Sequence, residues 1–253
     1  MHTHVELNEA TNKIMTKDTY AKPLITVIIP VYNGEQFISE AINNVLEQNY
    51  PALEIIVIND GSTDNTEFVV KNLDADLRYF YIENQGPSFA RNQGVKYSTG
   101  NYIAFLDADD LLPENNLSIL SKELVQNTEV DIVRGYAQLM KKNLLSGVYE
   151  TEGDPRFSFP AFIGAALYRK EVFDKVGLFD TSLHFGEDSD WYMRATELNV
   201  RMKWLDQVTL FVRRHGKNMT EGKDLVQLNT LRVFKKAVDR LRNQKNGFQE
   251  NHS

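Results

Sequence analysis

The stretch Asn101-Tyr-Ile-Ala-Phe-Leu-Asp107-Ala-Asp109-Asp110 decides the predicted fold. Its residues 102–106 are apolar, a run long enough for a buried strand and too short for a typical helix. Three carboxylates follow, and ligands of open α/β sheets bind at the carboxyl ends of strands. On an extended chain Asp107 and Asp109 would share a face and could ligate Mg²⁺ or Mn²⁺. The alternative is a solvated acidic turn that caps the next helix.

Composition narrows the class of protein. The 253 residues are 42% hydrophobic and 25% charged, as in an ordinary globular protein. The net charge of −7 argues against a nucleic-acid binder held by phosphate contacts. The chain has no cysteine, which excludes disulfides and thiolate chemistry and is compatible with a reducing compartment. It contains neither an apolar run of about 18 residues nor a hydrophobic signal segment, so we expect a cytoplasmic protein without a transmembrane segment.

The first 110 residues predict strands that alternate with helices. Apolar runs at 24–29, 53–58, 78–82 and 102–106 indicate strands, and the segments 35–48, 64–73 and 86–97 between them indicate helices. This alternation predicts parallel strands with right-handed crossovers. The loops at 30–34, 59–64 and 107–110 all follow strands, so we expect them to gather at one edge of the sheet.

The pattern loosens after residue 110. Helices are expected at 113–126, 170–176, 187–198 and 222–243, strands at 131–140 and 201–213, and a polar, poorly structured excursion at 141–158. The final helix carries an apolar stripe accompanied by basic residues, and we expect it to pack on the domain or on a second subunit. Peripheral contact with a membrane is the minority alternative. The stripe consists of Leu225, Leu228, Leu231, Phe234, Val238 and Leu241.

Seven motifs in order resemble the family 2 glycosyltransferases of the GT-A fold. They are Val27-Ile-Ile-Pro-Val-Tyr-Asn33, Val57-Ile-Asn-Asp-Gly-Ser-Thr-Asp64, Ala90-Arg-Asn-Gln-Gly94, Phe105-Leu-Asp-Ala-Asp-Asp110, Ile163-Gly-Ala-Ala166, Val176-Gly-Leu-Phe-Asp180 and Gly186-Glu-Asp-Ser-Asp-Trp191. The resemblance covers roughly residues 23–220. It implies a Rossmann-like, mainly parallel central sheet flanked by helices, with a smaller acceptor-side region and a C-terminal helix.

The resemblance also implies a division of the chain. Residues 1–22 would be a flexible N-terminal segment, and 23–220 a GT-A glycosyltransferase domain. Within that domain, 23–110 would be the nucleotide-binding half and 111–220 the acceptor-binding half. Residues 221–253 would be the C-terminal helix and tail.

A nucleotide-diphosphate sugar, most readily a UDP-sugar, is the donor that the resemblance implies. Asp109 would ligate Mn²⁺ or Mg²⁺, and Asp107 would help through the donor ribose or the metal's water shell. Tyr32 could stack on the base and Asp60 could accept a hydrogen bond from it, although a packed aromatic and an ordinary Asp-Gly turn are the alternatives. Pro30 and Ala108 belong to the same nucleotide-sugar motifs.

Two basic residues extend this site by resemblance. Arg91 matches the family's basic residue near the nucleotide, and the alternative is a surface salt bridge. His215, which follows two arginines, could ligate the metal or donate to a phosphate oxygen, and the alternative is a solvent-exposed histidine.

The Glu-Asp motif supplies the predicted chemistry on the acceptor side. An inverting displacement needs a base opposite the departing diphosphate, and the resemblance assigns Asp188, with Glu187 orienting the acceptor or assisting. First-turn acids are also ordinary helix-dipole partners. Asp190 is a second candidate base, and Trp191 would be either an acceptor wall or a core residue.

These residues predict an inverting, non-processive transferase that moves one sugar to a saccharide or lipid-linked saccharide. The Gln-x-x-Arg-Trp pattern of processive synthases is absent after the Glu-Asp motif. The alternative function is an inactive nucleotide-sugar-binding or assembly module of the same fold. A homodimer and a location at the inner face of the membrane stay open.

Overall fold

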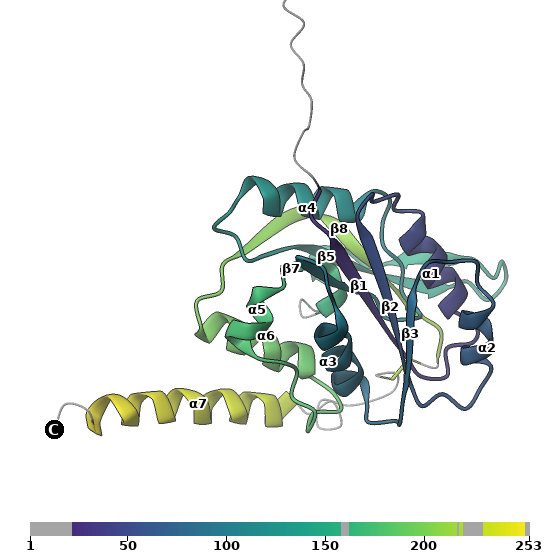
Figure 1. Ribbon diagram of the computed structural model, residues 1–253. Coiled ribbons are helices and arrows are strands. Elements are labelled where there is room, and N and C mark those ends of the chain that lie inside the picture. The colour runs from purple at the N-terminus through teal and green to yellow at the C-terminus, as the bar shows by residue number, and fades with distance from the viewer. Residues whose placement is uncertain (1–21, 158–161, 217, 220–229, 251–253) are drawn as a thin grey trace, which may run out of the picture.

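The computed structural model describes residues 22–157, 162–216, 218–219 and 230–250. It shows one central sheet with helices packed on both faces and the helix α7 (Thr230–Glu250) at the periphery (Figure 1). The expected segment 1–22 lies outside the described residues except for Lys22. No helix among the described residues is both long and apolar enough to span a bilayer.

Among the described residues, eight strands form the sheet. Seven follow the order β3-β2-β1-β4-β7-β5-β6, in which β7 and β6 pair with different stretches of β5, and the eighth strand, β8, runs parallel to β5 along most of its length. The strands are β1 (Ile25–Val31), β2 (Leu53–Asp60), β3 (Arg78–Ile82), β4 (Tyr102–Phe105), β5 (Ile132–Lys142), β6 (Tyr149–Glu152), β7 (Ala166–Arg169) and β8 (Met202–Arg214). The first four strands are parallel, as predicted. β7 then pairs antiparallel with both β4 and β5, so the whole sheet is mixed.

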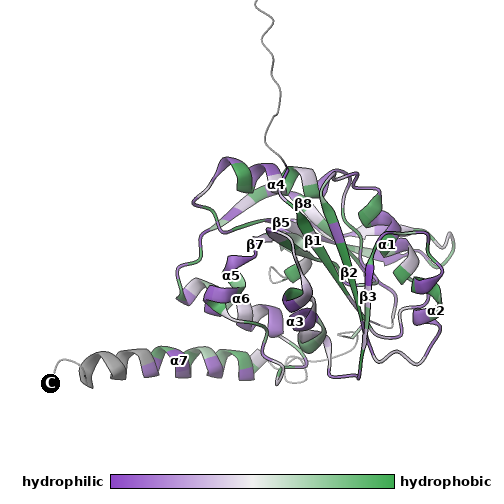
Figure 2. Ribbon diagram, viewed as in Figure 1, coloured by the Kyte–Doolittle hydropathy of each residue, from purple (hydrophilic) through white to green (hydrophobic). Residues whose placement is uncertain are grey.

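Buried strands explain why the first half is so apolar in sequence. Every residue of β1 and of β4 is buried, because helices cover both faces of a parallel sheet (Figure 2). One hydrophobic cluster joins the sheet to α1 (Ile38–Leu46), α2 (Thr66–Lys71) and α4 (Asn116–Gln126). A second cluster on the other face joins it to α3 (Pro87–Tyr97), α5 (Glu171–Val176) and α6 (Glu187–Glu197).

The helix α3 holds the two halves of the chain together. A Cβ atom at Gly94 would lie 2.3 Å from the Ile28 Cγ2 atom, so only glycine allows α3 to approach β1 this closely. On its other side, the Asn92 amide donates to the Phe179 carbonyl and accepts from the Phe179 N–H, both at 2.9 Å. The Ser88 hydroxyl donates to the Leu183 carbonyl at 3.2 Å. A helix from the first half of the chain thus anchors a loop of the second half.

Two predictions about the second half are wrong. Within the expected excursion at 141–158, β6 pairs antiparallel with β5. This hairpin carries polar residues on both faces and therefore lacks the apolar pattern that signals a strand. The final helix extends to Glu250, beyond the expected end at 243. The expected start at 222 and the stripe residues Leu225 and Leu228 lie outside the described residues.

Candidate active site

The loops after β1 and β2 lie side by side at the carboxyl edge of the sheet. The Ser62 hydroxyl accepts from the Asn33 N–H at 2.9 Å, and the Asn33 side chain accepts from the Thr63 N–H at 2.7 Å. These contacts confirm that the strand-end loops converge. Tyr32 lies in the first loop with 54% of its surface exposed, whereas Pro30 is buried in β1. An exposed ring here leaves a face free to stack on a planar group.

Asp60 is the last residue of β2, and its carboxylate binds the segment that leads into α3. Its carboxylate is 3% exposed and accepts from the backbone N–H groups of Gln85 at 2.9 Å and Gly86 at 2.8 Å. Burial raises the pKa of Asp60, although these hydrogen bonds oppose the shift. Gly61 follows with a φ of +73°, as in an Asp-Gly turn. The turn and a base contact are compatible, because each carboxylate oxygen has two lone pairs.

Asp107 and Asp109 do not share a face, contrary to the expectation for an extended chain. The Asp110 N–H donates to the Asp107 carbonyl at 2.9 Å, so the backbone turns directly after β4. The Asp107 side chain then points to Arg91, and the Asp109 side chain points to His215. Ala108 is buried between them, with 9% of its surface exposed.

Asp109 lies in a polar cluster with two residues from beyond β8. Its Oδ2 atom is 3.0 Å from the His215 Nε2 atom and accepts from the Asn218 amide at 3.2 Å. The His215 ring stacks on Phe37, with centroids 4.5 Å apart, and its side chain is only 9% exposed. The solvent-exposed alternative for His215 is therefore wrong.

A buried arginine binds the turn at residues 107–110, which we call the acidic turn. Arg213 is 2% exposed, donates to the Asp109 carbonyl from its side chain and pairs with Glu40 of α1. Its backbone N–H donates to the Asp110 carboxyl at 3.1 Å. Burial, with the neighbouring charges of Asp109 and Asp107, raises the pKa of Asp110 well above its ordinary value. Asp110 therefore serves the turn itself, as a buried group whose negative charge is disfavoured by burial.

Arg91 connects the acidic turn to the first turn of α6. It is 4% exposed, and its guanidinium lies 2.7 Å from Asp107, 2.8 Å from Glu187 and 3.7 Å from Asp188. Burial lowers the pKa of Arg91, but the three carboxylates outweigh it and raise the pKa well above the ordinary value. The alternative of a surface salt bridge is wrong, because this arginine is buried among the acids of two motifs.

Asp188 has the environment of a proton acceptor. Its Oδ2 atom accepts from the Ile163 N–H at 2.8 Å, whereas its Oδ1 atom is buried and has no hydrogen-bond partner among the described residues. Burial raises the pKa of Asp188 to about 7, with Glu187 and Asp107 adding to the shift and Arg91 opposing it. A general base works best with a pKa near the operating pH.

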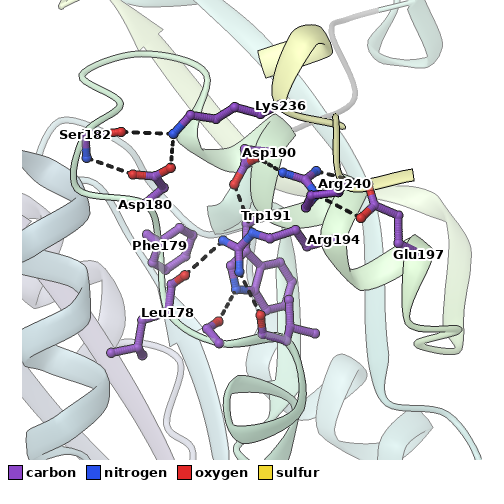
Figure 3. Close-up of polar contacts among 12 residues, drawn as sticks. Leu178, Phe179, Asp180, Ser182, Asp190, Trp191, Arg194, Glu197, Lys236 and Arg240 are labelled. Atoms are coloured by element: carbon purple, nitrogen blue, oxygen red, sulfur yellow. Dashed lines mark hydrogen bonds and ion pairs between the residues drawn. The ribbon is translucent and has the colours of Figure 1, made fainter. Parts of the chain in front are cut away.

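Asp190 and Trp191, two neighbours of Asp188 on α6, contact other parts of the protein (Figure 3). Asp190, the second candidate base, is 1% exposed and pairs with Arg194 at 2.9 Å and Arg240 at 2.8 Å. It lies on another face of the helix, since residues two apart do not point the same way. Trp191 is fully buried and donates to the Gly177 carbonyl, so it is a core residue and the acceptor-wall alternative is wrong.

The donor set of the acidic turn suits a divalent cation that is shared with phosphates. Among the described residues, no group of three or more His, Asp or Glu side chains is arranged to hold a metal ion. Asp109 and His215 nevertheless provide one carboxylate and one imidazole side by side. Mg²⁺ takes one or two carboxylates plus substrate oxygens, and imidazole suits several divalent transition ions, so the residues fit such an ion.

Comparison with known proteins identifies the family. Residues 26–177 match the family described as glycosyl transferase family 2. The chain belongs to glycosyl transferase family 2. It is 35% identical to an uncharacterized glycosyltransferase of Rickettsia typhi over 231 residues, which cover 85% of this chain and 70% of that protein. It is 34% identical to the uncharacterized glycosyltransferase EpsJ of Bacillus subtilis, covering 79% of this chain and 63% of EpsJ.

Solved structures confirm the GT-A fold of this family member. TarS 1–349 of S. aureus in complex with UDP-GlcNAc has a TM-score of 0.65 at 23% identity, over 79% of this chain and 62% of that one. The mannosyltransferase PcManGT of Pyrobaculum calidifontis, in complex with GDP-Man and Mn²⁺, has a TM-score of 0.65 at 24% identity, over 87% and 65%. This chain thus spans about two thirds of the length of each structure.

Sequence reasoning missed several residues of the family 2 site. Phe37 lies in the segment 35–48, where the sequence predicts a helix but gives no sign that this ring stacks on His215. Asn218 carried no motif, and only the structure brings it to Asp109. Arg213 was noted as part of a basic run, but its burial had no sequence signal. The Ile163 N–H that binds Asp188 belongs to a quoted motif, yet a backbone donor cannot be read from residue types.

Proposed function

We propose that this family 2 enzyme transfers a single sugar from a nucleotide-diphosphate sugar to an acceptor hydroxyl, with inversion at the anomeric carbon. The observation that carries the proposal is Asp188, a carboxylate with a pKa of about 7 and one buried oxygen that has no hydrogen-bond partner among the described residues. Arg91 ties it to the acidic turn, so a proton acceptor and a donor-side carboxylate share one buried cation. An inverting displacement requires such a base across from the leaving group.

The donor side binds the nucleotide in this proposal. Tyr32 stacks on the base, Asp60 accepts from its edge, and Asp107 contacts the ribose, with Pro30 and Ala108 shaping the backbone of the site. The exposed ring of Tyr32 and the partly exposed carboxylate of Asp107 support these roles. The related structures contain UDP-GlcNAc and GDP-Man, and we favour a UDP-sugar here.

Charge on the departing diphosphate needs neutralisation. Asp109 and His215, with Asp107 through bound water, would hold Mn²⁺ or Mg²⁺, which when bound supplies Lewis-acid stabilisation of that charge. Arg213 keeps the turn in place by binding the Asp109 carbonyl and the Asp110 carboxyl. The support is the paired Asp109 and His215 at 3.0 Å.

The acceptor side carries out proton transfer. The Asp188 carboxylate takes the proton from the acceptor hydroxyl as the hydroxyl oxygen attacks the anomeric carbon, and the bond from that carbon to the diphosphate breaks. Glu187, which Arg91 holds at 2.8 Å, orients the acceptor. The acceptor half at 111–220 would bind a saccharide or lipid-linked saccharide, and we place this non-processive reaction in the cytoplasm, which the absence of cysteine suits.

Calorimetry with UDP-, GDP- and dTDP-sugars in the presence of Mn²⁺ tests the proposal, followed by an assay of slow donor hydrolysis. We expect one donor class to bind and to be hydrolysed, and Asp188→Asn to abolish turnover while donor binding persists. Binding without any hydrolysis or transfer by the unchanged protein would favour the alternative, an inactive nucleotide-sugar-binding module.

A further inference from the structure

The helix α7 attaches to the domain through its charged face (Figure 3). Arg240 pairs with Asp190 at 2.8 Å and with Glu197 at 2.9 Å, both on α6. One turn earlier, Lys236 pairs with Asp180 and donates to Ser182. Ion pairs, rather than a packed apolar face, therefore fix the position of α7.

The apolar residues of α7 mostly point the other way. Val233 is 2% exposed and packs inward. The four other large apolar side chains described on this helix are 69%, 53%, 43% and 47% exposed: Leu231, Phe234, Val238 and Leu241. Because they are spaced by three or four residues, they form one stripe on the outer face, and we call these four residues the outer stripe.

This arrangement inverts that of an ordinary surface helix, which turns its apolar stripe to the core. Figure 1 shows α7 at the periphery, running away from the sheet, and Figure 2 shows hydrophobic and hydrophilic residues alternating along the coloured part of the helix. A contiguous exposed stripe of this kind marks a surface that another body covers.

The charges beside the outer stripe indicate what covers it. Residues 230–243 contain one acidic and five basic residues, and of the basic ones Arg232, Lys236 and Arg240 bind groups of the domain. Lys235 and Arg242 are exposed and lie next to the stripe on the helical wheel. Two copies of α7 packed face to face would bring these cations together, which is unfavourable. An anionic surface would instead neutralise them.

We propose that α7 lies on the surface of an anionic lipid bilayer, with the outer stripe in the interface and Lys235 and Arg242 beside the headgroup phosphates. The inner face of α7 holds α6, whose first turn carries Glu187 and Asp188. The bilayer would therefore lie on the side of the domain that holds α6. This inference does not depend on the proposed transfer activity.

Sedimentation with vesicles tests the proposal in the full chain. One set of vesicles contains equal parts of phosphatidylcholine and phosphatidylglycerol, and the other contains phosphatidylcholine alone. We expect binding to the anionic set that weakens as salt is raised, because charge attraction is screened. Phe234→Ala should weaken this binding roughly tenfold, since it removes most of one aromatic side chain from the interface. The double variant Lys235→Glu/Arg242→Glu should weaken it by at least tenfold.

Matched variants elsewhere on the molecule control for loss of surface apolarity and charge. Phe68 on α2 is 69% exposed, so Phe68→Ala removes the same group from a different surface. Lys96→Glu/Lys122→Glu makes the same charge change on α3 and α4. Both controls should bind anionic vesicles as the unchanged protein does.

Three outcomes would overturn the proposal. The first is no sedimentation with anionic vesicles at low salt. The second is an equal loss of binding in the Phe68→Ala control. The third is a dimer in light scattering that Phe234→Ala dissociates, because the outer stripe would then face a second copy of the chain.

Discussion

Replacing Asp188 with Asn should abolish transfer and at the same time stabilise the fold above neutral pH. The substitution keeps the shape of the side chain and an oxygen that can accept from the Ile163 N–H. It removes the negative charge, which the proposed reaction needs and which the buried site disfavours. Function and stability should therefore change in opposite directions at this one position.

The size of the stabilisation follows from the pKa of Asp188. In the unfolded chain this carboxyl loses its proton near the ordinary value of 3.8, whereas in the folded protein it does so at about 7. The folded state thus binds the proton more tightly, and stability falls as pH rises from about 4 to about 7. The full cost, present only above pH 7, is on the order of 2–4 kcal/mol. Asn avoids this cost.

Denaturant unfolding of the parent and Asp188→Asn proteins at about pH 5 and about pH 8 measures the effect. We expect the gain in the free energy of unfolding at the higher pH and little gain at the lower pH. Asp190→Asn is the matched control on the same helix: it breaks pairs with Arg194 and Arg240 and should cost about 3 kcal/mol at both pH values. Its folded fraction should keep transfer activity.

The reasoning fails in either of two cases. If Asp188→Asn turns over donor and acceptor at the parent rate, Asp188 is not the base. If it is less stable than the parent at the higher pH, burial does not disfavour the charge at this site.

Three further predictions concern the reaction and the packing. The kcat/KM of transfer should fall about tenfold per pH unit below pH 7, as Asp188 takes up its proton, and a profile that stays flat down to about pH 5 would exclude this titration. Asp109→Ala should weaken Mn²⁺-dependent donor binding at least tenfold in calorimetry, whereas Asp110→Asn should not, because Asp110 is buried and an amide oxygen can still accept from the Arg213 N–H; equal losses would contradict the division of roles. Gly94→Ala should lower the free energy of unfolding by about 1–3 kcal/mol, since its Cβ would meet the Ile28 Cγ2 atom, and the same substitution should cost less in an Ile28→Ala background; additive losses would refute the contact.

The first half of the fold was readable from sequence because burial on both faces leaves a continuous apolar run. β1 and β4 are such runs, and the loops after β1 and β2 converge as predicted. The hairpin of β5 and β6 was missed because an edge hairpin can be polar on both faces. The apolar pattern of a sequence reflects which side chains are buried, so it does not reveal a strand whose side chains are mostly exposed.

The candidate site was predictable as motifs but not as contacts. Asp107 and Asp109 were placed on one face because an extended chain was assumed, whereas a turn sends them apart. Residue type could not show that Arg91 is buried, because the three acids around it come from two distant segments. Both errors concern the path of the backbone between known residues.

The anchoring of α3 has a consequence for chimeric enzymes. A graft of a foreign acceptor half at the apparent boundary near residue 110 would separate Asn92 from its two bonds with Phe179, and Ser88 from Leu183. It would also pair Arg91 with a Glu-Asp turn of different position. The exchangeable unit is therefore not contiguous. It consists of residues 88–92 together with 177–188. A chimera that takes its acceptor half from another enzyme should therefore take the matching residues of α3 from that enzyme as well.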